Sequence, residues 1–186
     1  NVAELLTWSR SHPGQLEYAS NGVGSSSHLA AELFATAANI RMTHIPYKGL
    51  APAMADLLSG QVKIMFSSLV AIVPFVQAGR LTALATTGAA RSPLLPNTPT
   101  VSEGGVRDYR AGSWYGVLAP AGTPAAIISK VDAAIQTALA RSEVRAQLSA
   151  DGAEPIGGGP QAFATHIRTE LGRVRELAQR IGLKPE

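Results

Sequence analysis

The sequence predicts an α/β fold, with a mainly parallel sheet flanked by helices, and two observations lead to it. Short β-type runs alternate with helical runs in the first half, and Gly60 and Gly79 stand where helices commonly end. A strand, helix, strand succession favours parallel pairing through right-handed crossovers. With 186 residues and 46% hydrophobic content, the chain can bury the core of one large domain or two small ones.

The elements of the first half follow one another in short steps. Val2, Leu5 and Leu6 recur at helical spacing, which predicts a helix at the start of the chain. Strands are then expected at residues 16–19, 42–45, 62–66 and 81–86. The intervening helices are expected at residues 26–38, 51–59 and 71–78.

The second half has a different texture. Residues 88–112 are rich in Pro, Gly, Ser and Thr, which indicates an ordered excursion or a linker. The stretch "SWYGVLAP", residues 113–120, predicts one more strand. Thr123 and Pro124 then favour the start of a helix, with Thr as its cap and Pro in its first position. A last long helix is expected at residues 160–181.

Composition argues against several classes of protein. The net charge is +3, but basic and acidic residues are interspersed and only 5% of the residues are aromatic, so nucleic acid is not an expected partner. The chain has no cysteine, which removes disulfides and thiolate chemistry. No apolar run reaches the roughly 18 residues that a membrane-spanning helix needs. The sequence therefore predicts a globular protein outside the bilayer.

The stretch "LEYASNGVGSSSHLAAELF" turns from a strand into a helix through two glycines and three serines. Unpaired N–H groups and the helix dipole make such a turn suitable for an anion. Gly22 and Gly24 allow close approach of the backbone, while Ser25, Ser26 and Ser27 add hydroxyl donors. The stretch predicts a site for a carboxylate or a phosphate; the alternative is that the serines only cap the helix.

Known nucleotide and hydrolase motifs do not fit this turn. A P-loop needs a lysine that is lacking here, and the dinucleotide pattern needs a glycine where Ser27 stands. A hydrolase elbow needs a second glycine where His28 stands. The alternative function is a serine-dependent hydrolase or transferase that uses Ser25 or Ser26 with His28, but no acidic residue is placed locally to orient that histidine.

His28 is also weighed as a metal ligand. It lies four residues before Glu32, and these two side chains are too few for a zinc site. We expect a structural histidine that stays neutral near the positive end of the helix and orients the loop. No metal and no cofactor are predicted.

Four motifs carry a family resemblance: "YASNGVGSSSHLAAELF", "THIPYKGLAPAMADLLSGQVKIMF", "LPNTPTVSEGG" and "SWYGVLAPAGTP". Together they resemble the Bug family, the TctC-type periplasmic solute-binding proteins of tripartite tricarboxylate transporters. The resemblance implies a periplasmic protein with a two-lobed, periplasmic-binding-protein-like fold. It also implies a small organic carboxylate in the cleft between the lobes, delivery to the membrane subunits of the transporter, and no catalysis.

The resemblance also carries an expectation about the extent of the chain, which begins at Asn1 without a signal peptide. It implies that residues 1–112 are lobe two, and that residues 113–186 are the crossover strand and C-terminal helices of an incomplete lobe one. An N-terminally truncated chain of this kind is expected to pair from residue 113 onward with another polypeptide, as a swapped dimer or with a complementing fragment, or to displace that segment. The remaining alternative is a nonfunctional fragment.

The resemblance further assigns the ligand contacts. The turn matches the family loop that holds one carboxylate, which makes its six polar and glycine positions binding residues: Asn21, Gly22, Gly24, Ser25, Ser26 and Ser27. Ser67 and Ser68 stand where members often place an Asp, so plain carboxylates are favoured over amino acids; an ordinary polar turn is the alternative. Lys48 either attracts the anion or is solvated. Trp114 either walls the cleft or is buried in the hinge.

Overall fold

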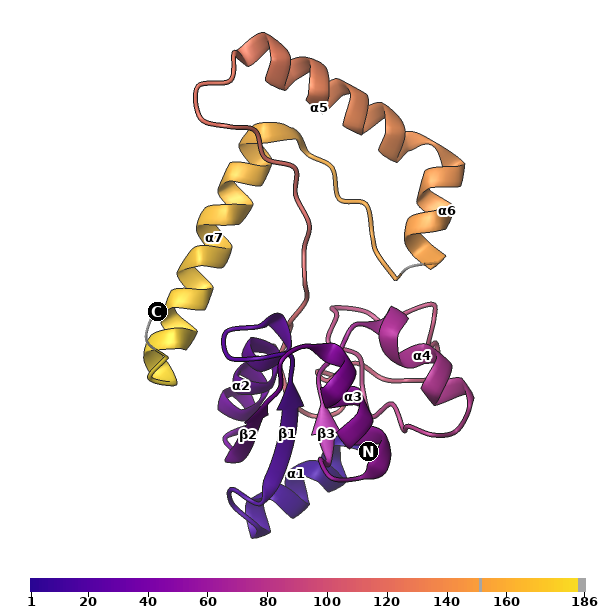
Figure 1. Ribbon diagram of the computed structural model, residues 1–186, viewed down its shortest axis with the longest axis vertical. Helices are drawn as coiled ribbons and strands as arrows, with labels where there is room; N and C mark the ends of the chain where they lie inside the picture. Colours follow the sequence, from indigo (N-terminus) through magenta and orange to yellow (C-terminus); the bar gives the residue numbers. More distant parts are fainter. Residues whose placement is uncertain (151, 184–186) are drawn as a thin grey trace. The chain divides into compact units, whose positions relative to one another are not determined.

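Three parallel strands form the sheet of the protein. The computed structural model describes residues 1–150 and 152–183. Its sheet has the order β2-β1-β3 (Figure 1), with bounds β1 Leu16–Ser20, β2 Met42–Pro46 and β3 Ile64–Met65. The register places Tyr18 of β1 between His44 of β2 and Ile64 of β3. Because the strands are parallel, their carboxyl ends lie at one edge of the sheet.

Four helices accompany these strands: α1 (Val2–Ser11), α2 (Ser26–Ala38), α3 (Leu50–Ser59) and α4 (Leu69–Gln77). The opening helix is confirmed, and a capping box between Asn1 and Glu4 satisfies its first N–H groups. Buried apolar side chains form two clusters. Ala19 packs with Ala53 of α3 in one, while the other joins α1 and α2 to the loop residues near Val101.

Two of the predicted strands are wrong. In residues 81–86 only Thr86 forms a β-bridge, an isolated one with Thr100, although Leu84 and Ala85 pack on the core. Residues 113–120 form no ladder with any described residue, and Tyr115 is 94% exposed. A strand requires a neighbouring backbone as well as an apolar pattern, and neither segment has such a neighbour along its length in the described chain. The strand expected at residues 62–66 is shortened to β3.

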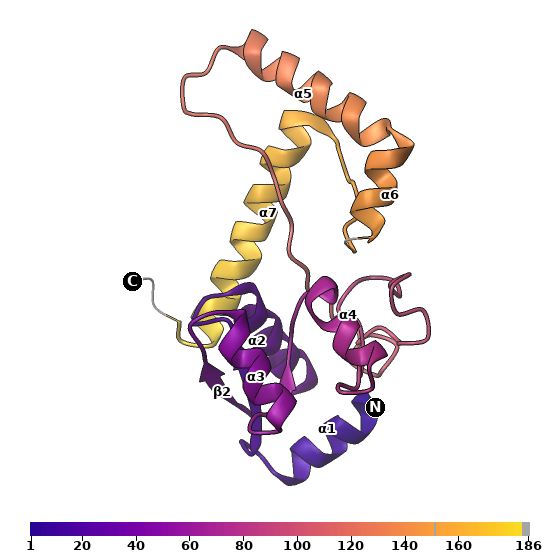
Figure 2. The same cartoon turned by 45° about the vertical axis from the view of Figure 1, so that its right-hand side comes forward.

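The chain divides into two compact units, Asn1–Ser113 with Leu177–Glu186, and Trp114–Glu176. The second half contains α5 (Ala125–Ala140), α6 (Ser142–Ala150) and α7 (Gly159–Arg180), and Figure 2 shows α6 following directly on α5. The last long helix is thus confirmed. Pro124 takes the N-cap position of α5 without a side-chain capping bond, and the Thr123 hydroxyl, expected to cap the helix, donates to the carbonyl of Pro120 instead. No helix in the described ranges is both long and apolar enough to cross a bilayer.

Candidate ligand-binding site

The carboxyl edge of the sheet collects three helix N-termini. The loops that follow β1, β2 and β3 lead into α2, α3 and α4, respectively (Figure 1). In the described residues that begin these helices, no first turn carries an acidic side chain. Residues 20–31, 46–55 and 66–79 contain no Asp or Glu, and Lys48 is their only Lys or Arg. Helix dipoles and unpaired N–H groups therefore give this edge a positive potential that favours an anion.

The fold brings most of the predicted site residues to this edge. The turn after β1, Lys48 after β2, and Ser67 and Ser68 after β3 all lie there. Trp114 belongs to the second unit, where the centre of its ring lies 5.7 Å from that of Phe163 and 5.0 Å from that of His166, both in edge-on contact. It is 42% exposed, so the expected burial is wrong.

The loop after β1 is closed by its own serines. Ser25 caps α2: its Oγ accepts a hydrogen bond from the His28 N–H (3.3 Å) and donates to the carbonyl of Gly22 (2.7 Å). The Oγ of buried Ser27 accepts from the N–H of Asn21 (2.9 Å) and lies 3.0 Å from the Ser25 Oγ. These two hydroxyls are therefore engaged within the loop.

The two glycines of the loop donate their N–H groups inward. The Gly22 N–H donates to Ser20 Oγ and the Gly24 N–H to His28 Nδ1, both at 3.1 Å. Both glycines have positive φ, 129° and 74°, which L side chains rarely adopt. These two N–H groups were expected to donate to the ligand. In the structure they donate to Ser20 and His28 instead, and they hold the loop in shape.

Some donors of the loop stay unengaged. Within the described chain, no acceptor reaches the N–H groups of Val23, Ser26 or Ser27. The hydroxyl of Ser26 is exposed and also lacks a protein partner among the described residues. The Oδ1 of Asn21, an acceptor, is buried and has no hydrogen-bond partner in the described structure. Three amides and one hydroxyl at a helix N-terminus are the donor set that a carboxylate accepts.

A stacked aromatic cluster lies directly behind this loop. The rings of His28 and His44 stack at 4.1 Å, and Tyr18 stacks on His44 at 4.9 Å. His44 Nε2 lies 2.6 Å from Ser20 Oγ, while the Tyr18 hydroxyl donates to Glu32 (2.5 Å). Sequence reasoning missed Tyr18, Ser20 and His44. Two features of the sequence could have revealed them. Alternation along β1 puts Tyr18 and Ser20 on one face of the sheet, and pairing of the strands predicted at residues 16–19 and 42–45 brings His44 beside them.

Both histidines of the cluster favour the neutral form. Burial lowers the pKa of His28 below its ordinary value, although the Glu32 carboxylate partly opposes this. Burial also lowers the pKa of His44, and the proximity of His28 adds to the effect. The predicted structural role of His28 is confirmed, because the ring is 6% exposed and its Nδ1 accepts from the loop.

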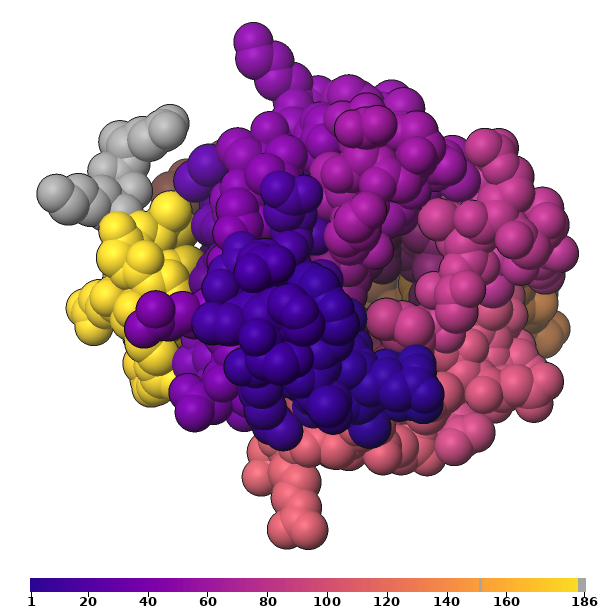
Figure 3. Space-filling model, turned by 90° about the horizontal axis from the view of Figure 1, so that it is seen from below, coloured from indigo at the N-terminus to yellow at the C-terminus, as the bar shows by residue number. Residues whose placement is uncertain are grey.

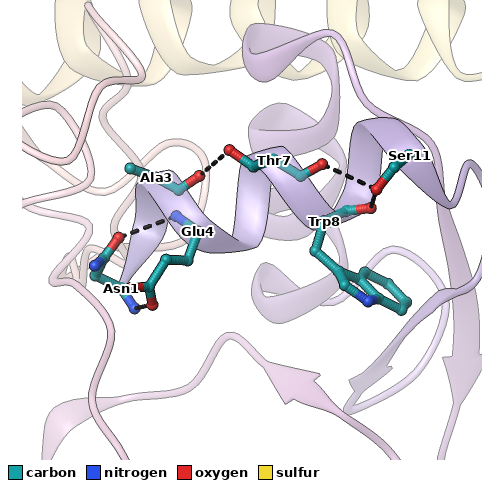
Figure 4. Close-up of a pocket in the computed structure, with 6 residues that line it drawn as sticks. All are labelled: Asn1, Ala3, Glu4, Thr7, Trp8 and Ser11. Atoms are coloured by element: carbon teal, nitrogen blue, oxygen red, sulfur yellow. Dashed lines mark hydrogen bonds and ion pairs between the residues drawn. The ribbon is translucent and has the colours of Figure 1, made fainter.

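Two hollows of the surface are lined by other residues. One, of about 480 Å³, is lined by one side of α1 (Figure 4). Figures 1 and 2 place α1 where β1 begins, and Figure 3 shows it beside the segment of residues 90–112. The other, of about 500 Å³, lies where α2 ends and β2 begins. Neither hollow is lined by residues of the loop after β1, and neither gathers unengaged donors from several helix N-termini, so they do not compete with the carboxyl edge as a ligand site.

Comparison with known proteins gives consistent likenesses. Residues 1–183 match the family described as Tripartite tricarboxylate transporter family receptor. Protein BugT of Bordetella pertussis is 33% identical over 97% of this chain and 55% of its own length. R. palustris Rpa4515, solved with adipate, is 37% identical with a TM-score of 0.88, over 100% of this chain and 62% of that chain. MatC from Rhodopseudomonas palustris, solved with bound malate, is 32% identical with a TM-score of 0.79, over 95% and 61%.

These likenesses confirm the predicted α/β fold with its parallel sheet flanked by helices. They also define how much of each relative is matched. The chain spans 55% of the length of BugT and 62% and 61% of the two solved chains.

Proposed function

Because the chain belongs to the family of tripartite tricarboxylate transporter receptors, as its four motifs indicated, we propose that it binds a small organic carboxylate for delivery to a membrane transporter. One observation carries the proposal: three helix N-termini meet at an edge that has no acidic residue. Adipate and malate, the ligands of the two solved relatives, are both dicarboxylates and support this class of ligand. The proposed compartment is the periplasm, with residues 1–112 as lobe two and residues 113–186 as part of lobe one.

The donors that remain available define the proposed contacts. One carboxylate accepts hydrogen bonds from the N–H groups of Val23, Ser26 and Ser27 and from the Ser26 hydroxyl. Asn21, Gly22, Gly24 and Ser25 fix the shape of the loop around it. Ser67 and Ser68, at the end of the neighbouring strand, reach the rest of the ligand. Lys48 attracts it through long-range charge.

The geometry gives little support to a serine-dependent enzyme. The ring of His28 contacts no serine hydroxyl in the described structure, because its Nδ1 binds the Gly24 N–H and its Nε2 lies 3.9 Å from Glu32. Ser20 and His44 do have the spacing of a nucleophile and a base. Ser20, however, is 0% exposed and cannot reach a substrate. We therefore propose a binding protein without catalytic activity.

Calorimetry of the full-length gene product against mono-, di- and tricarboxylates tests the proposal directly. Ser26→Ala should weaken binding of the best ligand by about 1.5 to 3 kcal/mol, the value of a hydrogen bond to a charged group, or roughly ten- to a hundredfold. Ser59→Ala is the matched control, because that hydroxyl is exposed and bonds to Asp56 at the end of α3, away from the edge. Equal affinities of the two variants would remove the Ser26 hydroxyl from the site.

The charge of the ligand gives a second test. Ser67 and Ser68 supply no carboxylate at the edge, so an ammonium group on the ligand would be desolvated without a partner. Succinate should therefore bind more tightly than aspartate, its 2-amino analogue, in the same calorimeter. Tighter binding of aspartate would show that an acidic residue outside these loops reaches the ligand.

A further inference from the structure

Two histidines from different elements hold the ligand loop from behind. His28 begins α2 and accepts the Gly24 N–H through Nδ1 at 3.1 Å. His44, on β2, lies 2.6 Å from Ser20 Oγ, which in turn accepts the Gly22 N–H at 3.1 Å. Each histidine is thus linked to one glycine amide of the loop, His28 directly and His44 through Ser20.

The two rings are also linked to each other. They stack at 4.1 Å with an angle of 13° between their planes. His28 is 6% exposed, and Tyr18, which stacks against both histidine rings, is 0% exposed. A positive charge on either ring would therefore face the other ring at short range with little water to screen it.

Protonation has different consequences at the two rings. A proton on His28 Nδ1 would turn the only acceptor of the Gly24 N–H in the described structure into a second donor, so this bond would break. A proton on His44 allows Nε2 to donate to Ser20, so that bond survives, but the charge repels a charged His28. His28 is therefore the more sensitive of the two.

We propose that His28 and His44 are positioning residues for ligand binding, and that both rings must be uncharged for the loop to present the amides of Val23, Ser26 and Ser27 to a carboxylate. The proposal rests on the carboxylate-binding function proposed above. It goes beyond that function by assigning to the site two residues that need not touch the ligand, together with a dependence on pH.

The charged groups around the pair set the sign of this dependence. Glu32 lies 3.9 Å from His28 Nε2 and favours its protonation, but its Oε1 already accepts from Tyr18. Arg41 and Arg180 are the positively charged residues that line the same hollow as Glu32 in the described structure. A bound anion would also favour protonation, whereas burial disfavours it for both rings. We expect the loss of the Gly24 contact to outweigh the attraction of the anion, because the ring faces the inner side of the loop.

The resulting window lies below neutrality. Because burial lowers both pKa values from an ordinary value of about 6.5, affinity should be full near neutral pH. It should decline as the pH falls below about 6.5. Ligand carboxyl groups, with pKa values near about 4.3, stay ionised through most of this window.

Calorimetry with adipate at about pH 7.5 and about pH 5.5 tests the proposal. The affinity of the wild type should fall by a few-fold and by less than about tenfold, because a group whose pKa is lowered from about 6.5 is only partly protonated at about pH 5.5. His28→Asn keeps an acceptor near the position of Nδ1, and His44→Gln keeps a polar group near Nε2. His28→Asn should bind at neutral pH and change less than about threefold with pH, and His44→Gln should show a reduced dependence. His12→Gln, on a histidine that stacks on Trp8 in the first unit, should behave as the wild type.

A second readout separates this proposal from the proposed function. In the protein without adipate, the NMR signal of the Gly24 amide should titrate together with the His28 ring. If adipate and the rest of the carboxylate panel fail to bind at either pH, the proposed function is wrong, and the Gly24 signal alone decides the positioning role. A Gly24 amide that does not respond when His28 titrates overturns the positioning role, as does an unchanged pH dependence of adipate affinity in His28→Asn.

Discussion

The loops after β1 and β3 occupy the same edge of the sheet and both lead into helices, yet they are held in different ways. Side chains of the sheet and of α2 hold the first, through Ser20, Ser25, Ser27 and His28. The second begins α4 at Ser68, whose side chain makes no capping bond in the described structure. Side-chain hydrogen bonds therefore fix the first loop, whereas the Ser68 side chain contributes no such bond to the second, and we expect the second to adjust more readily to a ligand.

This difference has a consequence for binding. Donors that are fixed before a ligand arrives bind it without a further loss of conformational entropy. A loop that adjusts loses some of that entropy, but it can accept ligands of different length. We therefore expect the loop after β1 to recognise the carboxylate group and the loop after β3 to adapt to the rest of the molecule.

Among the tests of this difference between the two loops, we expect the largest change in stability from Ser20→Ala. The change leaves the half-buried Gly22 N–H and His44 Nε2 without their shared partner, the hydroxyl of the fully buried Ser20. It should lower the free energy of unfolding by about 2 to 4 kcal/mol, because each buried unsatisfied group costs about 1 to 3. Urea denaturation measures it.

Ser68→Ala is the matched control for that change. Its hydroxyl has no capping bond to lose, so the free energy of unfolding should change by about 0.5 kcal/mol or less. If the two variants unfold at the same urea concentration, the loops are held equally and the comparison is wrong.

Alanine substitutions at two glycines test the packing of the loop after β1, with a smaller expected effect on stability. Gly22 (φ 129°) and Gly49 (φ 107°) precede α2 and α3, and alanine is strained at both, by about 1 to 3 kcal/mol. A Cβ on Gly22 would also lie 3.3 Å from the carbonyl oxygen of Tyr47, whereas one on Gly49 would meet nothing within 4 Å. Gly22→Ala should therefore have the lower unfolding midpoint of the two. The reverse order would show that the packing of the first loop contributes nothing beyond its backbone angle.

Much of the fold could be predicted because its signals are local. Apolar spacing found α1, and the glycines and serines of the first turn found the start of α2. The strands predicted at residues 81–86 and 113–120 failed because a ladder depends on a partner strand, which local pattern does not reveal. Periodicity reports which face is apolar, and it leaves open whether a neighbouring backbone is there to pair.

The sequence predicted the location of the candidate site much better than the hydrogen-bond partners within it. The sequence of the turn after β1 predicted an anion site there, which stays a prediction, and it predicted the supporting position of His28 that the Gly24 contact confirms. The division between donors that face the ligand and donors that hold the loop required the distances from Gly22 and Gly24 to Ser20 and His28. His44 comes from a strand 24 residues away from Ser20 in sequence, so only the register of β1 and β2 places it there.

The smallest effect concerns the loop after β2, which offers a charge instead of fixed amides. Lys48 is exposed at the carboxyl edge, so Lys48→Gln should weaken dicarboxylate binding by only about two- to fivefold at low ionic strength. The effect should disappear at about 1 M salt, where the screening length is about 3 Å. Lys63→Gln removes the same charge just before β3, at the opposite edge, and should leave affinity unchanged at both salt concentrations. A loss that persists in high salt would mean that Lys48 contacts the ligand directly, and the loop after β2 would then join the loop after β1 as a specific recognition element.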